Sequence, residues 1–108
     1  MSQPDTACLV LTTAGTEDEA DQLATAIVEA RLAACVQIQR VRSIYQWQGE
    51  TRTEPEWQLS MKTRTGRYVA LEAFIRERHS YEVPEIVQLP ITAGSADYLR
   101  WVAQGTAD

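Results

Sequence analysis

The chain has 108 residues and a net charge of −5, with 44% hydrophobic and 23% charged residues. A chain of this length can bury about two thirds of its surface, so we expect one globular domain over residues 1–108. The acidic balance disfavours proteins that hold nucleic acid or anionic membranes through excess Lys and Arg. No apolar run approaches the roughly 20 residues of a membrane span. Residues 1–6 contain no basic residue or apolar stretch of the kind that marks a secretory signal, so we expect a cytoplasmic protein.

The first third of the chain predicts a strand followed by a helix. Residues 8–13 are rich in β-forming side chains and end at Ala14-Gly15. Thr16 and Glu19 have the spacing of a capping box, which starts a helix. Apolar residues then recur at helical spacing, and the pattern predicts a helix from about Glu17 to Leu32.

The middle of the chain predicts a long hairpin. Cys35–Trp47 reads as a strand whose apolar residues change phase near Gln39–Arg42, from which we expect a bulge or bend there. Gly49 indicates a turn. From Trp57 to Met61, apolar and polar residues alternate, which predicts the third strand.

The last third predicts a second helix from Thr65-Gly66 to about Arg78, a strand at residues 86–89 and a short terminal helix after Gly94-Ser95. Within the second helix we expect Leu71 and Ile75 to be buried, together with one or both of Val69 and Phe74. The order β-α-β-β-α-β predicts an α+β fold, the ferredoxin-like sandwich, in which two helices cover one face of an antiparallel sheet.

The hairpin is too long for one domain to cover. Thirteen extended residues span roughly 43 Å, whereas a domain of this length has a diameter of about 34 Å. We therefore expect an overhang that carries Tyr45, Trp47 and Trp57. Exposed aromatic strand ends favour association, so the sequence predicts that these side chains pack against other copies of the chain. A ligand-stacking platform is the alternative.

Two residues are candidate metal ligands. His79 is the one histidine and lies at a predicted helix end, where it either hydrogen-bonds locally or ligates a metal. Cys35 is either a buried core thiol or a residue of metal or redox chemistry. With Cys8, the chain has three Cys and His residues in total, too few for a closed structural zinc site within one chain.

Three polar residues are candidates for a cleft between subunits: Lys62, Tyr81 and Glu82. Lys62 is the one lysine and falls on the polar phase of its strand, where it is either solvated or a partner for an anion. Tyr81 and Glu82 belong either to a polar loop or to an acid/base or interface site. No P-loop, nucleophile elbow, HExxH or dinucleotide motif is present, so an enzyme is the least supported class.

Five motifs resemble one known family, the CutA or divalent-cation tolerance proteins. They are RLAACVQ (31–37), RSIYQWQG (42–49), MKTR (61–64), HSYEVPEI (79–86) and LPITAGSADYLRW (89–101). The resemblance covers nearly the whole chain. It implies a ferredoxin-like fold, a homotrimer akin to the PII signalling proteins, and an association with metal tolerance and copper binding.

The resemblance also implies where copper would bind. A bacterial relative's proposed copper site corresponds to Thr12, Arg78 and His79, of which only His79 is a metal-ligating residue type. We therefore expect a non-enzymatic homotrimer that binds or responds to divalent metal, copper first. A PII-like module that binds a small anion between subunits, or a mainly structural trimer, are the alternatives.

Overall fold

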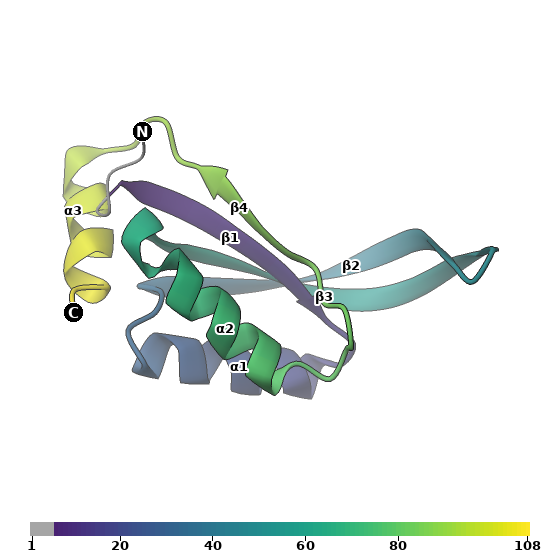
Figure 1. Ribbon diagram of the computed structural model, residues 1–108. Coiled ribbons are helices and arrows are strands. Elements are labelled where there is room, and N and C mark those ends of the chain that lie inside the picture. Colours follow the sequence, from purple (N-terminus) through teal and green to yellow (C-terminus); the bar gives the residue numbers. More distant parts are fainter. Residues whose placement is uncertain (1–5) are drawn as a thin grey trace.

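The computed structural model describes residues 6–108, which form a four-stranded antiparallel sheet and three α-helices (Figure 1). The strands are β1 (Ala7–Ala14), β2 (Cys35–Trp47), β3 (Glu50–Arg64) and β4 (Ile86–Pro90). The helices are α1 (Glu17–Glu29), α2 (Tyr68–Arg78) and α3 (Ala96–Gly105), with the 3₁₀ turn η1 (Thr65–Arg67) before α2.

The sheet order is β2-β3-β1-β4, so β2 and β4 are its edges. With the β-α-β-β-α-β order, this is the ferredoxin-like arrangement that the sequence predicts. In Figure 1, α1 and α2 lie side by side against one face of the sheet, and α3 lies at the end away from the hairpin tip. The opposite face of the sheet carries no helix, and we call it the open face.

The buried core lies between the sheet and helices α1 and α2. Alternate strand residues enter it, among them Val10 on β1 and its neighbours Leu59 and Met61 on β3. From α2, Leu71 and Ile75 are fully buried, as expected. Burying these side chains stabilises the fold, at roughly 25 cal/mol per Å² of apolar surface removed from water.

The expected end of α1 needs correction, and the alternative left open between Val69 and Phe74 on α2 is resolved. Helix α1 ends at Glu29 rather than Leu32, and Arg31 adopts a left-handed backbone with φ 61°. On α2, Val69 is 80% exposed, whereas Phe74 packs against the core. The apolar spacing is consistent with burial of either side chain, but only Phe74 lies on the side of α2 that packs against the core.

Of the bulge or bend expected in β2, the bulge is absent. Pairing with β3 runs without interruption from Cys35↔Lys62 to Trp47↔Glu50. Because side chains alternate strictly, Val36 and Ile38 face the helices while Val41, Tyr45 and Trp47 lie on the opposite face. The apolar side chains of β2 therefore point toward the helices in the first part of the strand and away from them, on the open face, in the projecting hairpin.

The hairpin extends beyond the rest of the sheet. Strand β1 accompanies β3 only as far as Ala14↔Trp57, so the seven pairs from Val41↔Glu56 to Trp47↔Glu50 project alone, about 23 Å of strand. The longest dimension of the molecule is 44 Å. Gln48 (φ 51°) and Gly49 (φ 79°) form the two-residue turn at the tip, where the positive φ values suit the twist of the strands.

Trp57 does not lie on the overhang. It pairs with Ala14 and Arg40 at the base of the hairpin, where it packs against the core. The Arg40 guanidinium lies 5.8 Å from the centre of its ring. Tyr45 and Trp47 do lie on the overhang and are 37% and 52% exposed.

Candidate functional site

The imidazole of His79 is held by hydrogen bonds through both ring nitrogens. His79 caps the C-terminal end of α2, and its side chain is fully buried. Nδ1 lies 3.0 Å from the backbone nitrogen of Tyr81. Because an N–H can only donate, Nδ1 accepts and the ring proton resides on Nε2, which donates to the Thr13 carbonyl at 2.6 Å.

A carboxylate completes the surroundings of His79. Glu19 accepts hydrogen bonds from the backbone N–H and the hydroxyl of Ser80, each at 3.0 Å. Its Oε2 lies 3.8 Å from Nδ1 of His79. Partial burial raises the pKa of Glu19, but the hydrogen bonds from the Ser80 backbone and side chain lower it, and the net pKa is lowered. Glu19 is therefore an ionised anchor for the loop after α2.

Tyr81 fastens the same loop to the base of the hairpin. Its ring stacks at a tilt against His79, with centroids 4.8 Å apart. Its hydroxyl donates to Glu56 at 2.9 Å. Burial and this hydrogen bond raise the pKa of Tyr81 well above its usual range, so the phenol stays protonated and remains a donor.

The sequence did not reveal this network, which joins α1, α2, β1 and β3. Glu19 was recognised only as part of a capping box, and its backbone N–H does bond to Thr16 Oγ1 at 3.1 Å. Its carboxylate instead binds Ser80, 61 residues away. Contacts at that separation leave no periodic signal in one sequence.

The positions that correspond to the copper site proposed for a bacterial relative form no metal site among the residues that the structure describes. The side chain of Thr12 is fully buried on the helix side of the sheet, and its hydroxyl has no hydrogen-bond partner in the described part of the chain. Arg78 stacks on Phe74, with the guanidinium 3.5 Å from the ring centre. His79 would have to break a hydrogen bond before either nitrogen could bind a cation. Within residues 6–108, no three His, Cys, Asp or Glu side chains gather as a metal site would require.

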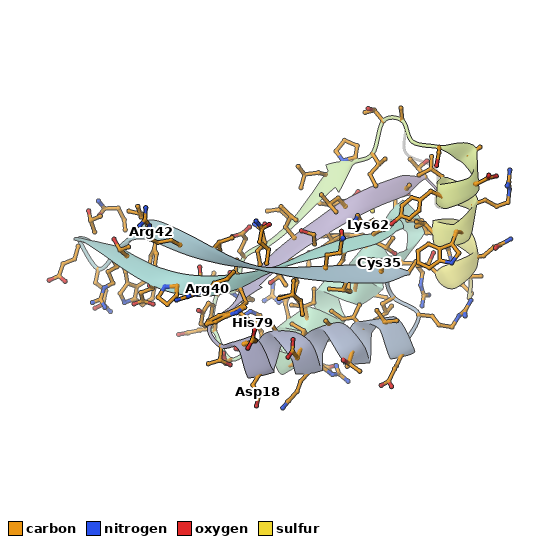
Figure 2. The ribbon with its side chains drawn as sticks, turned by 180° about the vertical axis from the view of Figure 1, so that it is seen from behind. Asp18, Cys35, Arg40, Arg42, Lys62 and His79 are labelled. Carbon is orange, nitrogen blue, oxygen red and sulfur yellow. The ribbon has the colours of Figure 1, made fainter. Side chains whose placement is uncertain are left out.

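Cys35 and Lys62 form a second group of candidate residues, at the end of the sheet nearer α3 (Figure 2). They are direct cross-strand neighbours on the open face. The ammonium of Lys62 donates to Oε1 of Gln37. The other cysteine, Cys8, is buried against the helices, and burial raises the pKa of its thiol to about 11, so it stays protonated.

The two groups of candidate residues lie apart within a subunit. Lys62 pairs with Leu9 near the start of β1, whereas His79 binds Thr13 near its end, which corresponds to about 13 Å along the strand. His79 and Cys35 therefore cannot share one metal ion in the same subunit. Glu82 is exposed in the loop beside Tyr81.

On the β1 and β4 side of Lys62, the open face is apolar. Leu9 pairs with Leu89 and Leu11 with Val87, which places the four side chains on this face. Leu89 and Val87 are 42% and 43% exposed. Isolated apolar side chains are common on protein surfaces, but four neighbouring apolar side chains on one face, with Tyr45 and Trp47 exposed on the same face of the hairpin, mark an interaction surface.

A family model described as CutA1 divalent ion tolerance protein matches residues 8–105. A divalent-cation tolerance protein CutA of Thermus thermophilus is 44% identical over 99 residues, which covers 91% of this chain and 96% of the relative. The chain spans between 54% and 59% of the length of several animal and plant relatives.

Solved structures agree with these sequence matches. A stable CutA1 from the psychrotrophic bacterium Shewanella sp. SIB1 superposes with a TM-score of 0.91 at 41% identity, covering 95% of this chain and 97% of that one. An Archaeoglobus fulgidus protein titled periplasmic divalent cation tolerance protein CutA also gives 0.91, at 29% identity, covering 94% and 99%. Among the described residues, no helix is long and apolar enough to cross a bilayer.

Proposed function

Because this chain belongs to the CutA1 divalent-ion tolerance family, we propose that it is a non-enzymatic, cytoplasmic homotrimer that binds or responds to divalent cations, with copper the first candidate. Neither nucleic acid nor membrane is a partner in this proposal. The observation that carries it is the exposed apolar surface of the open face and hairpin, including Leu89, Tyr45 and Trp47, which one subunit leaves uncovered.

The sheet edges favour a ring of subunits. Strands β2 and β4 are edges of different sequence and length. When an edge of one copy pairs with the other edge of the next, the contact is head-to-tail, and such contacts close into a cyclic oligomer when the rotation permits. Closing the ring would provide hydrogen-bond partners for the unpaired backbone groups of both edge strands. Left unpaired, these edges favour aggregation by pairing with strands of other chains.

The cation site in this proposal is shared between subunits. One subunit brings no three ligating side chains together within residues 6–108, and a tight site needs several ligands of suitable type. Copies arranged in a ring can combine a carboxylate such as Glu82, a thiol such as Cys35 or the imidazole of His79 from neighbours. Binding through His79 would cost the loop one of its hydrogen bonds, which predicts a weak site there.

Calorimetric titration with Cu²⁺ tests this proposal when mass is measured by light scattering on the same sample. We expect three times the chain mass and a copper stoichiometry of one or three ions per trimer. Cys35→Ser and His79→Gln, titrated beside the parent, show which residue takes part. If the protein is a trimer but binds copper no better than buffer does, the proposed metal binding is wrong and the proposed assembly is supported.

The alternative of a small-anion module is favoured by one observation. Lys62 places an ammonium on the open face between Leu9 and Cys35, hydrogen-bonded to Gln37. A cation next to a subunit boundary suits a carboxylate or phosphate. In a thermal-shift screen of anionic metabolites, a stabilisation that Lys62→Gln abolishes would support this alternative.

A further inference from the structure

Three arginines from three different elements meet at the C-terminal end of α3. Arg31 follows α1, and its Nη2 donates to the Gln104 carbonyl at 2.8 Å. Arg64 ends β3, and its Nη2 donates to the Thr106 carbonyl at 2.6 Å. The third is Arg67 in η1. The end of a helix exposes carbonyl oxygens with partial negative charge, which explains why guanidinium groups collect there.

A carboxylate occupies the point where two of these side chains converge. Oδ1 of Asp108 accepts from Nη1 of Arg67 at 2.8 Å and from Nη2 of Arg64 at 3.2 Å. The Asp108 side chain is 81% exposed, while those of Arg64 and Arg67 are 13% and 20% exposed. A single exposed carboxylate thus marks an anion position on a mostly buried cationic pair.

The hydrogen-bonding and charge capacity of this corner exceeds what Asp108 uses. Nε of Arg67 is buried and has no hydrogen-bond partner among residues 6–108. Among residues 6–108, Arg31 bonds to the carbonyls of Gln104 and Ala107 and forms no ion pair with a carboxylate. The helix end contributes only about half a negative charge. This concentration of positive charge stands out in a protein of net charge −5.

We propose that this corner is a binding site for a small tetrahedral dianion of the phosphate class, which takes the place of the Asp108 carboxylate between Arg64 and Arg67. Guanidinium forks match phosphate oxygens with paired, charge-assisted hydrogen bonds. An ion with two charges neutralises the arginines more completely than one carboxylate does. Because the Asp108 carboxylate is itself 81% exposed, water screens its ion pairs and weakens them, and an external anion displaces it at small cost. This inference does not rest on the cation proposal.

Calorimetric titration with inorganic phosphate at pH 8, at constant ionic strength maintained with sodium chloride, tests the site in the full chain. Asp108→Asn removes the competing charge and is expected to tighten binding about two- to fivefold, since an exposed ion pair contributes at most about that factor. Arg67→Gln is expected to weaken binding at least tenfold. Arg78→Gln removes an arginine on α2 and is the matched control, with unchanged affinity.

A folding control separates a lost site from a lost structure. Arg67→Lys keeps the charge but loses the fork, so it should bind phosphate more weakly than the parent and more tightly than Arg67→Gln, with the far-UV spectrum unchanged in all three. Glycerol 2-phosphate is titrated in parallel. Comparing its affinity with that of inorganic phosphate shows whether the site prefers a phosphate monoester or the free ion. The proposal is overturned if neither the parent nor Asp108→Asn binds phosphate better than chloride, or if Arg67→Gln binds it as the parent does.

Discussion

The Nε2 atom of His79 lies 2.6 Å from the carbonyl oxygen of Thr13, 66 residues earlier in the chain. This contact ties the end of α2 to the end of β1, and the backbone N–H of Tyr81 engages the other ring nitrogen. His79 is a candidate metal ligand because of its residue type. Its two hydrogen bonds show that it also orders the loop after α2.

Replacing His79 with alanine is expected to reduce the free energy of unfolding by about 2–4 kcal/mol, because two hydrogen bonds are lost in a buried site. Urea unfolding at a fixed protein concentration measures the change. Arg78→Ala, one residue earlier and exposed, is the control and should cost well under half as much. If both variants were equally stable, the histidine would not hold the loop.

Thr12 and Thr63 give a matched pair of buried hydroxyls on the same face of neighbouring strands. The Thr12 hydroxyl has no hydrogen-bond partner, whereas that of Thr63 donates to the Leu32 carbonyl at 2.8 Å. We expect Thr12→Val to be neutral or stabilising by up to about 1 kcal/mol and Thr63→Val to cost about 1–2 kcal/mol. Thermal unfolding of the two variants checks the order, and the reverse order would contradict the assigned hydrogen bonds.

Glu19 makes stability depend on pH in the acid range. Its pKa is lower in the folded protein than in the unfolded chain, so its contribution is fully present above the unfolded pKa and is lost as pH falls through the folded pKa. The stability difference between the parent and Glu19→Gln should therefore be largest near neutral pH and shrink from about pH 5 downward. Urea titrations at a series of pH values measure it. A difference that grew on acidification would refute the lowered pKa.

Gly105 on α3 lies against Ala34. A Cβ added at Gly105 would lie 2.9 Å from the Cβ and 3.4 Å from the Cα of Ala34. Alanine would normally improve a helix by about 1 kcal/mol over glycine, but here overpacking is expected to cost about 1–3 kcal/mol. Thermal unfolding should show Gly105→Ala less stable than the parent. Adding Ala34→Gly should recover part of the loss, and a stabilised Gly105→Ala would mean that the helix can move away.

Much of the fold followed from local patterns in the sequence. The Thr16 cap predicted the start of α1 where it lies, and alternation predicted the Trp57–Met61 part of β3, because these signals depend on adjacent residues. The phase change in β2 led us to expect a bulge or bend, and the strand has no bulge. Alternation of apolar and polar residues cannot distinguish a bulge from a regular strand whose apolar side chains move from one face of the sheet to the other. Trp57 was misplaced because β3 begins at Glu50, in a polar stretch containing Pro55 that resembles a loop.

The candidate site was less predictable than the fold. Residue type alone identified His79, Cys35 and Lys62 as candidates. Their positions relative to one another depend on strand register, which can be assigned only once the strand pairing is known. Whether they act on a metal or an anion remains a prediction. The bonds of Glu19 to Ser80 and of Tyr81 to Glu56 connect distant segments, and no spacing rule connects them.

Trp47 is expected to stabilise assembly rather than the subunit fold. It projects from the tip of β2, half exposed and remote from the core of its own subunit. Truncating a large aromatic that is buried at an interface costs about 3–5 kcal/mol, so Trp47→Ala should dissociate at higher protein concentration than the parent. Sedimentation velocity over a dilution series measures this. Val69→Ala, exposed on α2, is the control and should assemble as the parent does.

The mass of the parent protein in solution tests the central claim, that the open face and the hairpin are covered by other copies of the chain. Multi-angle light scattering on size-exclusion fractions at micromolar concentration should give three times the chain mass. A value equal to one chain mass would contradict the account, because Leu89, Val87 and Trp47 would then be exposed to water with no partner.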